Sequence, residues 1–193
     1  MYLRTMINLV KIGHNRGCQS LYRVAVAVFV VVATLFASSC DVINESLPTY
    51  EQSSIVKQGD YAPAFVAQTI DGESVEVGGE RDRALLLILF SHTCPDCKNL
   101  FTALHDAINL GVEYPDILAV SRGGSEADIR SFRSENGYTF PMVADESKDI
   151  YYLYATTYVP RCYVIDTAGV VQFMTYEYTP GDVELLFDSA LSL

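Results

Sequence analysis

The chain has 193 residues, which is enough for one domain of ordinary size plus a targeting segment but not for two full domains. Acidic residues outnumber basic ones by 24 to 13, a formal charge of −11 that disfavours binding to nucleic acid and to anionic lipid headgroups. Only three of the five cysteines lie beyond residue 40, and an odd number of this size does not make a disulfide-stapled scaffold.

The N-terminal residues 1–40 have the composition of a secretory signal. They carry four basic residues and no acidic one, and their apolar run, 24–37, has 14 residues, fewer than the roughly 20 of a membrane-spanning helix. Small residues then lead to Cys40, which resembles a bacterial lipoprotein processing site, although Ala37 stands where that pattern usually has Leu. We therefore predict export to the bacterial envelope or periplasm, with a lipid on Cys40 as the membrane anchor. A simply cleaved signal, with Cys40 incidental, is the alternative.

The part after the signal has a formal charge of −15 and begins with a polar stretch. Residues 41–58 show no sustained periodicity and predict a linker, so that the folded domain spans 59–193. A β-hairpin is predicted over 65–77, around the turn signal Asp71-Gly72. The run 84–90 is continuously apolar, which predicts a strand at the centre of a sheet covered on both faces.

The later elements follow from periodicity, capping residues and turn signals. In chain order they are a helix after the Cys-x-x-Cys pair that ends at Gly111, a strand over 116–121, a helix from the capping box at Ser125–Asp128 to Asn136-Gly137, a short helical stretch near 147–154, an antiparallel pair of strands over 161–166 and 170–175, and a helix over 182–191.

Cys94-Pro95-Asp96-Cys97 follows the central strand and opens a helix. Two thiols spaced in this way can close and reopen a disulfide, and the N–H groups and dipole of a helix N-terminus favour a negatively charged sulfur on the first cysteine. Half of a zinc site is the alternative, but neither a second Cys-x-x-Cys nor a suitably spaced histidine pair is present. We predict thiol–disulfide exchange, no metal, and no cofactor besides the redox-active disulfide Cys94–Cys97, since nucleotide and flavin motifs are lacking.

The order of these elements resembles the thioredoxin superfamily. Three stretches, 59–65 (Gly-Asp-Tyr-Ala-Pro-Ala-Phe), 89–98 around the cysteines, and 159–166 followed by Gly169, resemble the exported TlpA/ResA-like thiol–disulfide oxidoreductases and the wider redoxin family. The resemblance spans 59–193 and implies an α/β, thioredoxin-like fold, in which helices flank a central mixed sheet that carries an N-terminal β-hairpin extension.

The resemblance also implies roles for individual residues. Cys94 is expected to attack a substrate disulfide and Cys97 to resolve the mixed disulfide. A cis peptide before Pro160 is expected to face the cysteine pair, with Val159, Pro160, Thr93 and Pro95 along the binding groove for an extended substrate. The alternative for Pro160 is an ordinary trans proline at the start of a strand.

Several side chains near the pair remain open to two interpretations. Asp96 adds a negative charge that opposes thiolate formation and favours the reducing direction, or it is simply a solvated acid in the first helical turn. His92 is a candidate proton acceptor, because Ile88 and Leu100 replace the acidic residues of relatives, or it is a loop histidine without a role. Cys162 either approaches the site or is a buried, inert thiol, and we favour the second.

These observations predict an exported, lipid-anchored thiol–disulfide oxidoreductase that reduces disulfides of envelope proteins and takes electrons from a membrane-linked donor. One alternative is a thiol peroxidase of the redoxin family, although Ser91 and Cys94 occupy the positions where its peroxidatic threonine should stand. Another is a non-catalytic, lipid-anchored interaction module whose cysteine pair stays disulfide-bonded.

Overall fold

The computed structural model describes residues 47–193, so the predicted signal segment 1–40, Cys40 and the first part of the predicted linker lie outside the described residues. The main sheet has five strands in the order β5-β4-β3-β6-β7, and β1 and β2 form a separate hairpin. The elements are β1 (Phe65–Gln68), β2 (Ser74–Val77), β3 (Leu85–Phe90), α2 (Pro95–Asn109), β4 (Asp116–Arg122), α3 (Glu126–Asn136), β5 (Met142–Asp145), α4 (Tyr151–Tyr154), β6 (Arg161–Ile165), β7 (Val171–Tyr176) and α5 (Asp182–Leu191).

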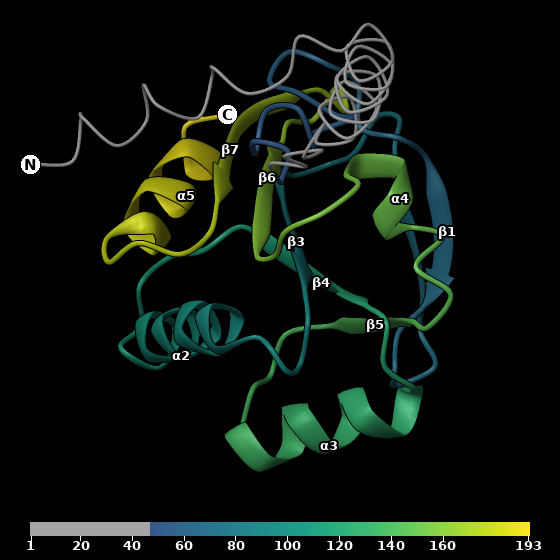
Figure 1. Cartoon of the computed structure of the whole chain (residues 1–193). Helices are drawn as coiled ribbons and strands as arrows, with labels where there is room; N and C mark the ends of the chain where they lie inside the picture. The colour runs from purple at the N-terminus through teal and green to yellow at the C-terminus, as the bar shows by residue number, and fades with distance from the viewer. Residues whose placement is uncertain (1–46) are drawn as a thin grey trace, which may run out of the picture. The chain divides into compact units, whose positions relative to one another are not determined.

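Strand β3 is the centre of the sheet, as its continuous apolar sequence predicts. It runs parallel to β4 and antiparallel to β6, and all six of its residues are buried. Because a strand exposes alternate residues to opposite faces, complete burial requires cover on both sides. Figure 1 shows α2 and α5 on one side of the sheet and α4 with the β1–β2 hairpin on the other.

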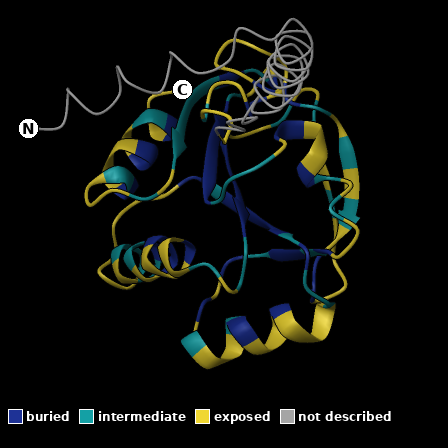
Figure 2. Ribbon diagram, in the orientation of Figure 1, coloured by how far each residue is buried: buried dark blue, intermediate teal, exposed yellow. Residues whose placement is uncertain are grey.

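The two faces of the sheet carry separate apolar cores. One core joins alternate residues of β3 to the inner faces of α2, α3 and α5. The other joins the remaining β3 residues to α4 and to Val77 of the hairpin. The helices are amphipathic, with buried residues toward the sheet and exposed ones outward (Figure 2). The mixed sheet with flanking helices and an antiparallel N-terminal hairpin confirms the predicted fold class.

The ends of α3 show why local sequence signals located it correctly. The Ser125 hydroxyl accepts the Asp128 N–H at 3.2 Å, and the Asp128 carboxylate accepts the Ser125 N–H at 2.9 Å, which completes the capping box. At the other end Gly137 has φ of +71°, the left-handed conformation that glycine adopts without steric cost.

Strand β5 is not predicted from the sequence. This strand has only four residues, and no alternation of apolar and polar side chains distinguishes it from a loop. It forms because Met142–Asp145 pairs in parallel with Ala119–Arg122 of β4, a contact that the local sequence does not encode.

The prediction of a linker over 41–58 is wrong for residues 48–58. Ser53, Ser54 and Val56 are buried, and the Ile55 N–H donates to the carbonyl of Tyr154 at 2.9 Å. The compact unit therefore begins at Pro48 rather than at Gly59. Within residues 47–193 no helix has both the length and the apolar character needed to cross a membrane.

Candidate active site

Cys94 is the residue that caps the N-terminus of α2. Its backbone is extended, with φ of −85° and ψ of 123°, and Pro95 occupies the first turn of the helix. Proline suits this place because the N–H that it lacks has no partner inside the helix. Cys94 is half-buried, so its sulfur remains open to approach from outside.

Cys97 lies in the first turn of the same helix and faces the core. It is 0% exposed, and its sulfur accepts the Ser91 N–H at 3.4 Å. Burial raises the pKa of the Cys97 thiol well above its ordinary value, and the bond from Ser91 offsets only part of this effect. Cys94 and Cys97 are both free thiols, one accessible and one sealed.

The loop before β6 completes the site. Its Val159–Pro160 peptide is cis, as the resemblance implied. The Cys94 thiol lies 3.6 Å from the Val159 carbonyl oxygen and is oriented to donate to it. Val159 is half-buried and Pro160 is buried, so the structure brings the accessible cysteine and the backbone of this loop together.

Thr93, Pro95 and Asp96 surround the accessible cysteine and are all exposed. The Thr93 hydroxyl lies 3.0 Å from the hydroxyl of Ser91. None of these three side chains lies in the core, and Asp96 occupies the first turn of α2, where its charge favours the helix dipole.

The imidazole of His92 lies against the loop between β4 and α3. A Cβ atom on Gly124 would lie 2.8 Å from both Cε1 and Nδ1 of the imidazole, so the ring rests directly on this glycine. The Nδ1 atom is buried and has no hydrogen-bond partner among the described residues. This contact with Gly124 brings the loop before Cys94 against the loop between β4 and α3.

Cys162, the third cysteine of the described residues, is 0% exposed and belongs to the same apolar core as Cys97. It stands opposite Ile88 in the pairing of β6 with β3. Burial raises the pKa of Cys162 to about 12. The prediction of a buried third thiol is confirmed.

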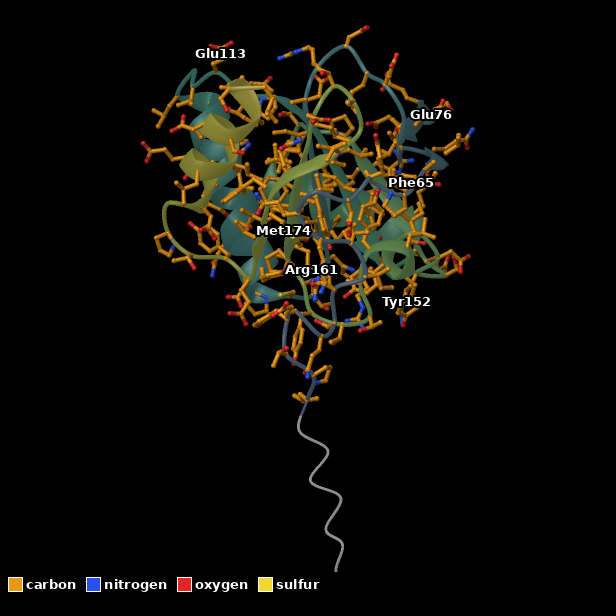
Figure 3. All side chains as sticks on the ribbon, turned by 90° about the horizontal axis from the view of Figure 1, so that it is seen from above. Phe65, Glu76, Glu113, Tyr152, Arg161 and Met174 are labelled. Atoms are coloured by element: carbon orange, nitrogen blue, oxygen red, sulfur yellow. The ribbon has the colours of Figure 1, made fainter. Side chains whose placement is uncertain are left out.

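Arg161 is the residue near the site that sequence analysis missed. It is 0% exposed, and it directly follows Pro160 at the start of β6. Figure 3 places it near the beginning of the described chain, whereas Tyr152 lies at the outer edge. A single arginine after a proline carries no sequence signal of burial, since arginine is almost never buried without partners.

Other features of the described residues offer no competing site around the cysteines. A cavity of about 710 Å³ lies between the hairpin and β5, lined by residues such as Thr69, Ala144 and Ser147, and neither Cys94 nor Cys97 borders it. Within 47–193 no group of three or more His, Cys, Asp or Glu side chains is placed to hold a metal ion.

The fold and the paired thiols define a thioredoxin-like protein with a dithiol site. The chain belongs to the AhpC/TSA family, whose model matches residues 58–174.

Curated relatives of this chain are named as thioredoxin-like proteins and thiol–disulfide oxidoreductases. The chain is 30% identical over 131 residues to the thioredoxin-like protein YneN of Bacillus subtilis, an alignment that covers 64% of this chain and 75% of YneN. It is 26% identical over 120 residues to the thiol–disulfide oxidoreductase ResA of Bacillus subtilis, with 60% of this chain and 65% of ResA covered. The resemblance to ResA-like proteins is therefore confirmed, and with it the enzyme class of thiol–disulfide oxidoreductases.

A solved structure supports the fold. The solution structure of a Bacteroides thetaiotaomicron protein matches with a TM-score of 0.64 and 21% identity, covering 73% of this chain and 94% of that protein. At this identity the likeness establishes the fold alone.

Proposed function

We propose that this protein is an exported, lipid-anchored oxidoreductase that reduces disulfide bonds of proteins in the bacterial envelope. The observation that carries the proposal is the difference in burial within one helical turn: Cys94 is open beside the Val159 carbonyl, and Cys97 is sealed behind it. Only the open sulfur can meet a protein disulfide first.

The reaction follows in two balanced steps. The Cys94 thiolate attacks one sulfur of the substrate disulfide, a Cys94–substrate disulfide forms, and the other substrate sulfur leaves as a thiolate. Cys97 then loses its proton and attacks the Cys94 sulfur, which releases the second substrate thiol and leaves a Cys94–Cys97 disulfide. Two electrons have passed to the substrate, so a thiol donor must reduce the pair before the next cycle.

The reducing direction is proposed from the charge beside the pair. A dithiol is a strong oxidant when the protein stabilises the reduced, thiolate form. Asp96, in the first turn of α2, places a negative charge between the two cysteines, which opposes that stabilisation. Since the region 1–40 has the composition of a signal that ends at Cys40, the donor is proposed to be a membrane-linked protein.

Trapping tests the assignment of the two cysteines. In the Cys97→Ser variant the first step remains possible and the second does not, so substrates should accumulate as mixed disulfides on Cys94 and be released by dithiothreitol. Cys162→Ala is the matched control, because it removes a buried thiol and leaves the pair intact. Absence of captured proteins in Cys97→Ser, or equal capture in Cys94→Ser, would overturn the assignment.

A thiol peroxidase is the second candidate, and membership of the AhpC/TSA family favours its inclusion. Two assays distinguish these activities: one measures thiol-dependent consumption of hydrogen peroxide, and the other measures reduction of the insulin disulfides. Our proposal expects insulin reduction with slow peroxide turnover, and the reverse result would favour the peroxidase. A pair that dithiothreitol cannot open would instead indicate the non-catalytic interaction module.

A further inference from the structure

The substrate loop, residues 156–160, has a conformation that its own sequence does not favour. It belongs to neither a helix nor a strand. Tyr158 has φ of +70°, in the left-handed region that side chains other than glycine rarely adopt. Such a backbone persists only where surrounding contacts hold it. The groups that hold this loop therefore decide where the Val159 carbonyl lies.

Arg161 provides one set of these contacts. Its Nε and Nη2 atoms both donate to the Thr157 carbonyl, at 3.1 Å and 2.9 Å. The guanidinium lies over the ring of Tyr176, with Cζ 5.1 Å from the ring centroid. Among the ion pairs of residues 47–193 none includes Arg161. Because a buried charge without a counter-ion is costly unless it is hydrogen-bonded, these bonds are what make its burial tolerable.

The same guanidinium reaches the segment at the start of the compact unit. Nη1 donates to the hydroxyl of Ser54 at 2.7 Å, and Nη2 donates to the hydroxyl of Ser53 at 2.5 Å. Both serines are buried, and each hydroxyl in turn donates to the Tyr50 carbonyl at 2.8 Å. The hydroxyls of Ser53 and Ser54 thus each accept a bond from Arg161 and donate one to Tyr50. Arg161 therefore connects the substrate loop to these two serines.

Tyr158 and Thr156 make further bonds to the same segment. The Tyr158 hydroxyl donates to the Pro48 carbonyl at 2.7 Å, and its ring centroid lies 4.5 Å from that of Tyr50. The Thr156 N–H donates to the Ser53 carbonyl at 2.9 Å. The loop is therefore fixed at three successive points before Val159.

We propose that Arg161 and the segment Pro48–Ser54 form a clamp that positions the Val159 backbone for an extended polypeptide substrate. Arg161 is a positioning residue, since it acts on the loop through its bond to the Thr157 carbonyl. Its side chain lies on the face of β6 opposite to that of Cys162, because neighbouring residues of a strand alternate between the two faces. The proposal rests on the proposed function and specifies its substrate class: a peptide that pairs with the loop needs the clamp, whereas a small disulfide that meets only the Cys94 sulfur does not.

The test uses the full chain with Ser53→Ala and Ser54→Ala combined, which removes two acceptors of Arg161 and leaves the arginine in place. We expect KM for a disulfide-linked peptide to rise about tenfold with kcat within about twofold of the parent, because misplacement of a binding loop weakens substrate positioning. The rate with 5,5′-dithiobis(2-nitrobenzoate) and the reduction potential of the pair should not change. Amide exchange at Thr156, whose N–H donates to the Ser53 carbonyl, should become faster.

Two further variants separate the clamp from a general loss of stability. Arg161→Lys keeps the charge but lacks the planar fork that bonds Thr157 and both serines together, so it should show the same rise in KM. The matched control, Ser131→Ala with Ser134→Ala, alters two exposed serines of α3 and should behave as the parent.

The outcomes are distinct. An unchanged peptide KM and unchanged amide exchange in the Ser53/Ser54 variant would overturn the clamp. A fall in the small-disulfide rate as large as the loss with peptide would also overturn it, because that result indicates a general structural effect. If the parent protein reduces no peptide disulfide, the proposed function fails. The clamp is then judged from amide exchange alone: faster exchange in the Ser53/Ser54 variant supports it, and unchanged exchange overturns it.

Discussion

Gly124 provides a quantitative test of how the loop before Cys94 is packed. Its φ is +88°, and a Cβ atom there would lie 2.8 Å from Cε1 and Nδ1 of His92. Gly124→Ala therefore has two costs. The left-handed conformation costs a residue with a Cβ about 1–2 kcal/mol, and displacement of the buried ring edge costs about 1–3 kcal/mol as overpacking. We expect the free energy of unfolding to fall by about 3 kcal/mol.

Gly72→Ala is the control for the first cost. Gly72 has nearly the same φ, +87°, but nothing lies within 4 Å of its added Cβ. Urea unfolding of both variants should give the smaller loss for Gly72→Ala, and most of the difference measures the contact with His92. In a His92→Ala background this difference should shrink to the remainder due to Ile129, whose Cδ1 would lie 3.3 Å from the added Cβ. Equal losses in the two glycine variants, or a difference of the same size without His92, would show that this packing argument is wrong.

Three further predictions concern the thiols and the start of α3. In the native, reduced protein at pH 8, iodoacetamide should modify Cys94 alone, because burial raises the pKa of Cys97 and of Cys162, and peptide mapping that finds a second native site would count against the described burial. The pKa of Cys162 rises from 9.0 unfolded to about 12 folded, so its contribution to stability is complete below pH 9 and is lost as the pH rises toward 12. Urea titrations across this window should show a loss of about 1.4 kcal/mol per pH unit from this group, and Cys162→Ala should remove that contribution, whereas an unchanged slope would contradict it. Ser125→Ala removes the capping hydroxyl of α3 and should lower the free energy of unfolding by about 1 kcal/mol, while a variant as stable as the parent would show that the cap contributes nothing.

The elements that sequence analysis located correctly are those whose signals are local. The apolar run that became β3 indicates burial on both faces by composition alone. The Ser125 capping box and Gly137 mark both ends of α3 through contacts within a few residues. The turn at Asp71-Gly72 likewise sets the hairpin from its own sequence.

The features that were missed depend on partners distant in the chain. Strand β5 forms because β4 has an edge with which it can pair. Residues 48–58 pack on the domain because the Tyr154 carbonyl of α4 accepts the Ile55 N–H and because Arg161 donates to the Ser54 hydroxyl. The burial of Arg161 itself depends on acceptors that lie more than a hundred residues earlier. No periodicity or spacing in the sequence records such pairings, so they emerge only from the folded arrangement.

Whether Cys94 and Cys97 form a reversible redox couple can be measured by equilibrating the folded protein in glutathione buffers of stepped potential and mapping the disulfides after acid quenching. We expect one two-electron transition that forms a Cys94–Cys97 disulfide, is abolished in Cys97→Ser and persists in Cys162→Ala. A protein that forms no such bond, that links Cys162 instead, or whose bond does not reopen in reducing buffer would show that the two cysteines are not a reversible couple.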